Sequence, residues 1–251
     1  MERQELLEPF ERMIADLFPT SRVREIEQGA AWPDERGAVE RSGFLDLLAP
    51  EDRGGAGLPL DHAVPLFMAL GRHAAPLEIG EMMLARASLG EEALGHATAI
   101  LLAAATAGAS DRVLSMTVAY ANDRVQFGKP IGRQQAVQQQ LAVMAQDCIA
   151  VRMAVELAAA EFPRNGALKA AVAKATAARM SARIANTAHA VHGAIGISRE
   201  HDLQLFTRRL HAWRLRDGAE TLWHARLGDA LLRAGDGAVD WARAELFGEA
   251  P

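Results

Sequence analysis

Apolar residues recur at helical spacing along most of the chain. The first set precedes Pro19 and comprises Leu6, Phe10, Met13, Ile14 and Leu17. Residues three or four positions apart share one face of a helix, so this set predicts a short amphipathic helix that the proline ends. The same reasoning predicts helices over residues 35–43, 61–72 and 78–87.

Four longer helices are predicted in the second half of the chain, over residues 97–122, 134–162, 167–192 and 222–234. The first is apolar almost all round, which predicts burial between other helices or between subunits. Short connections between long helices favour an antiparallel bundle. We therefore predict an all-α protein, with an N-terminal helical domain at residues 1–90 and a C-terminal antiparallel four-helix bundle at residues 91–251.

The composition agrees with a helical protein and limits its partners. Half of the 251 residues are apolar, only 5% are aromatic, and alanine dominates. Alanine has the highest helix propensity, whereas strands favour β-branched and aromatic residues. The net charge is −5 and the basic residues are scattered, so we expect no nucleic acid partner. The most apolar run, residues 97–109, is too short to span a bilayer, so we also expect no membrane partner.

We expect the chain in the cytoplasm. Its opening residues are charged, and no apolar stretch of a secretory signal follows them. Cys148 is the single cysteine, which excludes an internal disulfide and fits a reducing compartment. His189 and His192 are three positions apart on a predicted helix, but no carboxylate or cysteine stands nearby to complete a ligand set. No metal site is therefore expected.

The polar turn between the first two long helices is a candidate binding site. Gly128, Pro130 and Gly132 end one helix and set up the next. Arg124 offers a planar fork of donors that matches phosphate oxygens, and Phe127 offers a face for an aromatic ring. A dinucleotide requires such groups. The same two residues would equally serve as a helix C-cap and a core anchor, so the pattern leaves both roles open.

Two stretches of the chain resemble the acyl-CoA dehydrogenases. The run Tyr-Ala-x-x-Arg-x-Gln-Phe-Gly-Lys-Pro-Ile, followed by Gln-Ala-Val-Gln-x-x-Leu-Ala-x-Met-Ala, spans Tyr120 to Ala145 and resembles the start of that family's C-terminal helical domain. The segment from Trp32 to Gly57, with its Pro-Glu-x-x-Gly-Gly-x-Gly loop, resembles the N-terminal helical domain. Full-length relatives carry a β-barrel middle domain between the two, and here only residues 88–95 stand in its place. The resemblance thus implies that the middle domain is missing.

The resemblance also implies a site for flavin adenine dinucleotide (FAD). In the family, the arginine and phenylalanine of the Arg-x-Gln-Phe-Gly turn reach the diphosphate and adenine of the FAD that a neighbouring subunit mainly holds. The family's Gln-x-His-Gly-Gly-x-Gly turn is matched up to Gly196, with Ala190 in place of the glutamine and Ala194 in place of the second glycine. The residues that the resemblance assigns to FAD are Arg124, Gln126, Phe127, Gln135, His192, Gly193, Gly196 and Thr221.

Asp217 occupies the position of the family's catalytic base, a glutamate that removes the α-proton of the acyl thioester. Aspartate is one methylene shorter, and an ion pair with the adjoining Arg214 or Arg216 would weaken it as a base. In some relatives the base stands at the position of Thr98, which carries no carboxylate. The alternative role for Asp217 is the N-cap of the helix that follows it.

Three functions are open at this level. The first is an acyl-CoA dehydrogenase-like flavoprotein or flavoprotein subunit of lipid or steroid catabolism, which removes hydrogen from Cα and Cβ of an acyl-CoA thioester with FAD as hydride acceptor. It would act in a homo-oligomer or in a heteromer with a full-length relative. The second is a non-catalytic helical partner that stabilises such a relative. The third is a flavin-dependent monooxygenase, since one fold can host several chemistries, and oxygen consumption would identify it.

Overall fold

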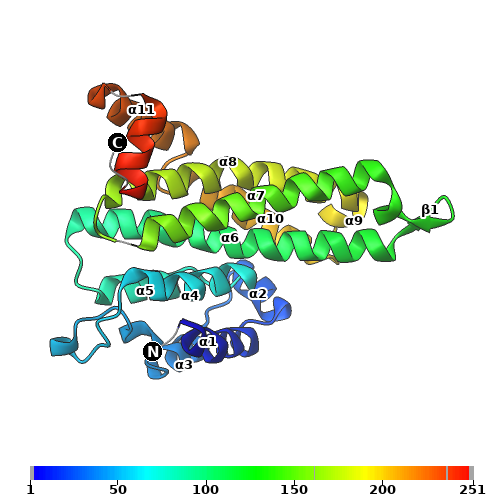
Figure 1. The fold of residues 1–251 in the computed structure, drawn as a ribbon. Helices are drawn as coiled ribbons and strands as arrows, with labels where there is room; N and C mark the ends of the chain where they lie inside the picture. The colour runs from blue at the N-terminus through cyan, green and yellow to red at the C-terminus, as the bar shows by residue number, and fades with distance from the viewer. Residues whose placement is uncertain (1–2, 161, 236, 249–251) are drawn as a thin grey trace.

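Two layers of helices form the molecule (Figure 1). The structure, a computed structural model, describes residues 3–160, 162–235 and 237–248, and within them strand is confined to one two-stranded hairpin. The shorter N-terminal helices lie along one side of the long C-terminal ones. They are α1 Arg3–Leu17, α2 Thr20–Glu27, α3 Pro33–Arg41, α4 Leu60–Arg72 and α5 Glu78–Arg86, with single 3-10 turns at Phe44–Asp46 and Glu51–Arg53.

The C-terminal half follows α5 after only four residues, 87–90, so no β-barrel domain stands between the two layers. Its elements are α6 Glu91–Asp123, β1 Val125–Gln126, β2 Lys129–Pro130, a 3-10 turn at Ile131–Arg133, α7 Gln135–Ala160, α8 Gly166–His192, α9 Ala194–Ile197, α10 Leu203–Leu215, α11 Glu220–Ala234, α12 Ala238–Ala242 and a π-helical turn at Arg243–Phe247. The prediction of an all-α protein without the middle domain is confirmed.

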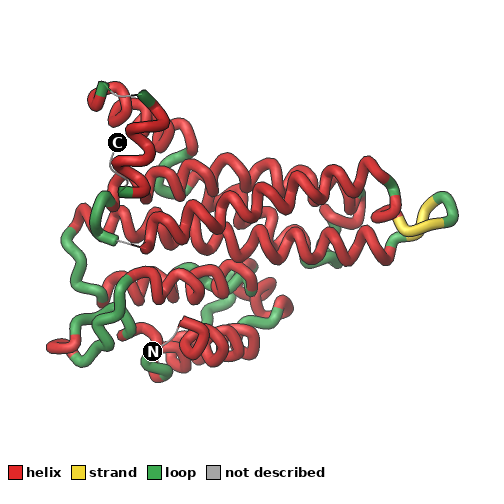
Figure 2. Tube along the Cα trace, viewed as in Figure 1, coloured by secondary structure: helices red, strands yellow, loops and turns green. Residues whose placement is uncertain are grey.

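Four antiparallel helices, α6, α7, α8 and α10, form the bundle (Figure 2). Helices α6 and α8 are its centre, because each packs against the other three. Their buried positions are mostly alanine, over residues 97–109 in α6 and 170–188 in α8. Small side chains let these helices approach closely while the interior stays densely packed.

The fourth bundle helix is α10, not the predicted segment 222–234. That segment is helical as expected, within α11, but it packs on the end of α8, and Trp223 is its one buried residue. The apolar stripe of α10 is Leu203, Phe206, Leu210 and Trp213. These residues recur about one helical turn apart, so the sequence contains the helical periodicity of α10. The arginines in the same stretch led instead to its interpretation as part of a catalytic segment.

Helix α4 joins the two layers of helices. A Cβ atom on Gly71 of α4 would lie 1.9 Å from the carbonyl oxygen of Ala105, and one on Gly108 of α6 would lie 1.8 Å from the carbonyl oxygen of Met68. Both contacts are possible only because glycine has no side chain. One hydrophobic core therefore runs through both layers. The division into domains at residue 90 stays a prediction, and its outermost residues, 1–2 and 249–251, lie outside the described residues.

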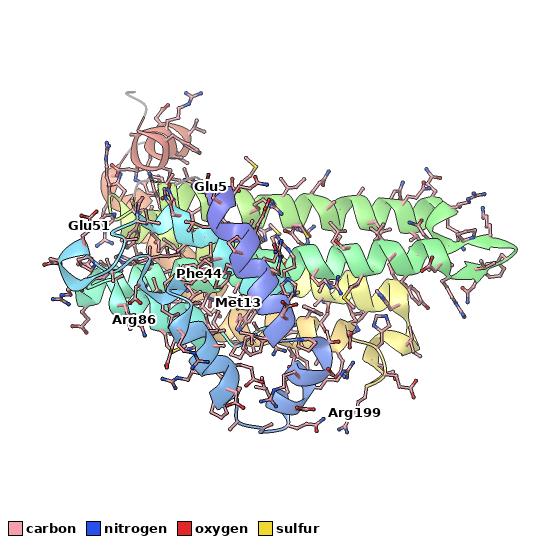
Figure 3. The ribbon with its side chains drawn as sticks, turned by 90° about the horizontal axis from the view of Figure 1, so that it is seen from below. Glu5, Met13, Phe44, Glu51, Arg86 and Arg199 are labelled. Carbon is pink, nitrogen blue, oxygen red and sulfur yellow. The ribbon has the colours of Figure 1, made fainter. Side chains whose placement is uncertain are left out.

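Helix α1 packs on the outer side of the N-terminal layer, and α2 contacts the C-terminal half (Figure 3). Phe10 of α1 is fully buried and meets the ring of Phe44 edge to face, with 5.0 Å between ring centroids. Arg24 of α2 donates a hydrogen bond of 2.6 Å to the carbonyl oxygen of Arg199 and forms an ion pair with Asp202. The N-terminal layer is thus tied to the loop between α9 and α10.

Helix α6 is long and apolar enough to cross a membrane by length and composition alone. It extends over 33 residues, so the apolar run at residues 97–109 underestimated the length of the apolar helix. The protein buries 72% of its most apolar stretch, which is what the core helix of a bundle requires. The absence of a membrane partner stays a prediction.

Candidate functional site

Seven of the eight residues assigned to FAD lie at one end of the bundle. Helices α6 and α8 end there and α7 begins there, next to the β1–β2 hairpin and α9 (Figure 1). We call this region the hairpin end, and its residues are Arg124, Gln126, Phe127, Gln135, His192, Gly193 and Gly196.

The hairpin presents Phe127 at its tip. Phe127 and Gly128 form the turn with φ of 52° and 76°, the left-handed conformation that two-residue hairpin turns adopt. The Phe127 side chain is 92% exposed, so the core-anchor alternative is wrong for this residue. Arg124 is the C-cap residue of α6, as its alternative predicts, but its side chain is exposed and forms no ion pair within the described residues. Its guanidinium remains available to a ligand.

The base of the hairpin is held by buried and hydrogen-bonded groups. Ile131 is buried, and its backbone N–H donates to the carbonyl oxygen of Arg124 at 2.8 Å. The side-chain amide of Gln138 donates to the carbonyl oxygen of Gly132 at 3.0 Å. These contacts fix where the exposed tip stands relative to the bundle.

His192 joins α6 and α8 beneath the hairpin. Its ring stacks on that of Tyr120, with centroids 4.4 Å apart, and its Nδ1 donates to the carbonyl oxygen of Ala188 at 2.8 Å. Burial lowers the pKa of His192, which keeps the ring neutral. His192 is 3% exposed and Gly196 is also buried, so the part of this turn that faces solvent is the segment from Gly193 to Ile195.

The opposite end of the bundle contains a cavity of about 560 Å³, which we call the Asp217 pocket. Its lining residues are Glu91, Glu92, Leu94, Gly95, His96, Thr98, Asp217, Trp223 and Arg226. Asp217 comes from the turn between α10 and α11, and Thr98 from the start of α6. Both positions at which the resemblance places the catalytic base therefore line one cavity. Thr221, the eighth residue assigned to FAD, belongs to this end of the molecule.

Neither arginine beside Asp217 forms an ion pair with it. Arg214 donates from Nε to Glu220 at 2.9 Å, and this side-chain hydrogen bond lowers the pKa of Glu220 to about 2. Arg216 forms an ion pair with Glu81 of α5. The concern that a neighbouring arginine would weaken Asp217 as a base is therefore not supported by the geometry.

Asp217 is not the N-cap of α11. That position is held by Ala219, without a side-chain capping bond, so the alternative role is wrong. Asp217 is exposed and has φ of 56°, and Gly218 follows with φ of 102°. Aspartate enters the left-handed region more readily than most residues, but at a cost that the surrounding structure must offset.

The two ends of the bundle are far apart. Thr98 lies on α6 and Arg124 is the C-cap residue of that helix, 26 positions later, which corresponds to about 39 Å at 1.5 Å per residue. A single FAD cannot contact both sets of residues. Within one protomer the structure thus brings together the hairpin-end residues, and separately Asp217 and Thr221.

Sequence reasoning missed several residues around the Asp217 pocket. Arg226 lies over the ring of Trp223, with 4.4 Å between the guanidinium carbon and the ring centroid, and His96 completes one wall. Beneath the turn, Lys174 of α8 is buried. Lys174 could have been found in the sequence, because it is a charged residue among the alanines of the predicted helix over residues 167–192.

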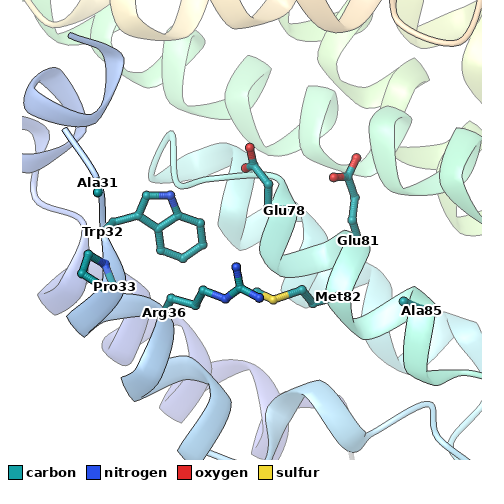
Figure 4. A pocket seen from close by; sticks show the side chains of 8 residues that line it. All are labelled: Ala31, Trp32, Pro33, Arg36, Glu78, Glu81, Met82 and Ala85. Carbon is teal, nitrogen blue, oxygen red and sulfur yellow. The ribbon is translucent and has the colours of Figure 1, made fainter. Parts of the chain in front are cut away.

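A second cavity of about 680 Å³ opens between the start of α3 and α5 (Figure 4). Trp32 and Met82 supply apolar walls, and the carboxylates of Glu78 and Glu81 point away from Arg36. The cavity contains none of the predicted site residues. One of its lining residues, Glu81, forms an ion pair with Arg216, which precedes Asp217 in the chain. This ion pair connects the cavity to the turn that carries Asp217.

Comparison with known proteins identifies the family. The family model for the acyl-CoA dehydrogenase C-terminal domain matches residues 82–232, more than half of the chain. The chain belongs to the acyl-CoA dehydrogenase family. It is 37% identical over 121 residues to acyl-CoA dehydrogenase IpdE2 of Mycolicibacterium smegmatis, and the match covers 48% of this chain and 38% of that protein. The chain therefore spans well under two thirds of this acyl-CoA dehydrogenase.

Two solved structures share the fold of nearly the whole chain. The ChsE4-ChsE5 complex from Mycobacterium tuberculosis contains a chain with a TM-score of 0.81 and 19% identity, matched over 94% of this chain and 98% of that one. The Tcur3481-Tcur3483 steroid acyl-CoA dehydrogenase gives a TM-score of 0.80 and 19% identity, over 93% and 99%. At this identity the likeness shows the fold alone. The helical fold of this chain thus accounts for nearly the whole of one chain in each of these two structures.

Acyl-CoA dehydrogenases depend on FAD. The hairpin end of this family member fits the nucleotide half of that cofactor, because the exposed Arg124 suits phosphates and the exposed Phe127 suits a flat ring. The exposed backbone at Gly193 lies at the same end. The described residues contain no β domain to cover a flavin ring over the Asp217 pocket. The described residues therefore fit the nucleotide half of FAD and lack a domain that would cover its flavin ring.

Proposed function

We propose that this chain is one subunit of an acyl-CoA dehydrogenase heteromer. In the proposed complex the hairpin end completes the FAD site of a full-length subunit, and the complex dehydrogenates an acyl-CoA thioester between Cα and Cβ. The observation that carries the proposal is the exposure of Arg124 and Phe127 at a bundle end about 39 Å from the Asp217 pocket. The fold shared with chains of two heteromeric complexes supports it.

At the proposed shared site the hairpin end binds and orients the nucleotide. Arg124 would hold a phosphate of FAD through its guanidinium, and Phe127 would offer its ring to the adenine. Gln126 and Gln135 add exposed amides that can hydrogen-bond at the rim. Bound FAD supplies the hydride acceptor for the reaction.

In the Asp217 pocket the chain's own groups act on the acyl thioester. The Asp217 carboxylate would accept the α-proton as general base, and the hydride from Cβ would pass to a second FAD that the partner subunit holds over this pocket. Leu94 and Trp223 provide apolar surface for the acyl group, and Arg226 provides a positive charge beside it. The neighbouring carboxylate, Glu220, forms an ion pair with Arg214. Asp217 is therefore the exposed carboxylate near this turn that can act as the base.

Arg124→Ala tests the role of the hairpin end. Loss of the guanidinium removes the phosphate contact without disturbing the core, so we expect the purified heteromer to retain less FAD, with affinity reduced about tenfold or more. Bound flavin is measured by its visible absorption per mole of complex. Arg133→Ala is the matched control, since Arg133 is also exposed in the same turn but is not assigned to FAD. Equal flavin retention by both variants would argue against the proposed site.

A non-catalytic stabilising subunit is the second candidate, because the described residues leave the Asp217 pocket without a covering domain. Asp217→Asn separates the two. If Asp217 is the base, turnover of the assembled complex falls by about a hundredfold or more. Asp229→Asn, an exposed substitution on α11, serves as the control. Unchanged turnover in Asp217→Asn would favour the stabilising role.

A further inference from the structure

Lys174 is a buried cation beneath the turn that carries Asp217. It lies on the core face of α8, between Ala171 and Ala177, and is only 1% exposed. Burying an ammonium group is costly unless its three N–H groups find acceptors. A lysine in this position therefore needs partners in the elements that pack on α8.

Those partners are three carbonyl oxygens around the turn. The Lys174 Nζ donates to the carbonyl oxygens of Trp213 at 3.0 Å, Arg214 at 3.1 Å and Gly218 at 3.2 Å. The first two belong to the last turn of α10, where carbonyl groups lack partners within the helix and carry partial negative charge. The third belongs to the residue after Asp217. One ammonium group thus holds the turn on both sides of the carboxylate.

A second contact holds the same carbonyl group. The indole Nε1 of Trp223, on α11, donates to the carbonyl oxygen of Gly218 at 3.2 Å. Asp217 and Gly218 both have left-handed backbone conformations, with φ of 56° and 102°. Such conformations persist where surrounding contacts enforce them. Lys174 and Trp223 supply those contacts from two different helices.

We propose that Lys174 is a positioning residue, which holds the turn 215–219 so that the Asp217 carboxylate faces the Asp217 pocket. The catalytic meaning of this role rests on the function proposed above. Burial, the larger effect, lowers the pKa of Lys174 to about 8. The negative charges of Asp217 and Glu220 act in the opposite direction and favour the charged ammonium, which agrees with their position near it.

Lys174→Met tests the proposal, because methionine has a similar shape but no donors. We expect kcat of the assembled heteromer to fall about tenfold or more through misplacement of the base, with KM changed less than about twofold. Lys174→Arg, which retains charge and donors, should recover part of kcat. Ser181→Ala is the control, since it removes a buried hydrogen bond of α8 made only to that helix's own carbonyls. It should leave kcat unchanged.

A spectroscopic signature separates positioning from general stability. In the full chain labelled with ¹⁵N-tryptophan, the indole N–H signal of Trp223, assigned with Trp223→Phe, should shift in Lys174→Met and stay in place in Ser181→Ala. If Lys174→Met fails to fold, as judged by circular dichroism, Lys174→Gln takes its place and should give the same shift. An unmoved Trp223 signal would overturn the positioning role. Unchanged kcat in Asp217→Asn would instead overturn the proposed function, and a shifted Trp223 signal would still support Lys174 as the group that holds the turn.

Discussion

Phe127 and Lys174 depart most clearly from the usual partition of polar and apolar side chains at the two candidate sites, which lie at opposite ends of the molecule. Phe127 is apolar yet 92% exposed, and Lys174 is charged yet 1% exposed. Phe127 contributes nothing to the core, which is consistent with a role toward another molecule. Lys174 donates to three carbonyl groups around the turn that carries Asp217, which offsets the burial of its charge.

At this scale the motif predicted that Arg124 and Phe127 lie together, because they are neighbours in sequence, and their role toward FAD stays a prediction. The environment of Asp217 could not be predicted in the same way. Its arginine neighbours in sequence, Arg214 and Arg216, have their partners elsewhere, and Lys174 reaches the turn from about 40 residues away. Contacts of that separation leave no local pattern in the chain.

Lys174 leads to a prediction on the pH dependence of stability. Burial lowers its pKa from the usual 10.5 to about 8, so between these values the unfolded chain binds a proton that the folded chain has released. The free energy of unfolding contributed by Lys174 therefore rises with pH across this window, by about 3 kcal/mol in total. Urea denaturation at both ends of the window should show the native protein gaining this amount relative to Lys174→Met. A constant difference would mean that Lys174 titrates at its ordinary pKa.

Among the elements, α1, α3 to α5, α7 and α8 follow the predicted boundaries within a few residues, whereas α6 starts earlier than predicted and α2 was not predicted. Periodicity predicted them because each buries one continuous apolar face or, in α6, nearly all faces. The exception is the assignment of the fourth bundle helix to 222–234 instead of α10. Periodicity shows that a segment is helical, but only packing shows which helix fills the bundle and which lies across its end.

The contact between α4 and α6 leads to a second prediction. Gly108→Ala places a methyl group against the carbonyl oxygen of Met68, so the helices must separate. We expect the free energy of unfolding to fall by about 1–3 kcal/mol or more, as for other overpacked cores. Gly95→Ala, on the same helix with open space around it, should instead raise the free energy of unfolding by up to about 1 kcal/mol. Thermal unfolding of both variants checks the pair, and similar melting temperatures would show that the close contact is absent.

The whole molecule has one candidate site at each end of a long bundle. Sequence resemblance gave the family and the missing middle domain, since both depend on local motifs and their order. It could not show that Arg124 and Asp217 stand at opposite ends, because that follows from α6 being one unbroken helix of 33 residues. Under the proposed function, this separation requires a second chain to complete the site.

The most direct test is the native mass and flavin content of the chain purified alone and after co-expression with a full-length acyl-CoA dehydrogenase. We predict little flavin on the chain alone, and a heteromer of both chains with stoichiometric FAD after co-expression. Stoichiometric FAD on a homo-oligomer of this chain alone would contradict the account.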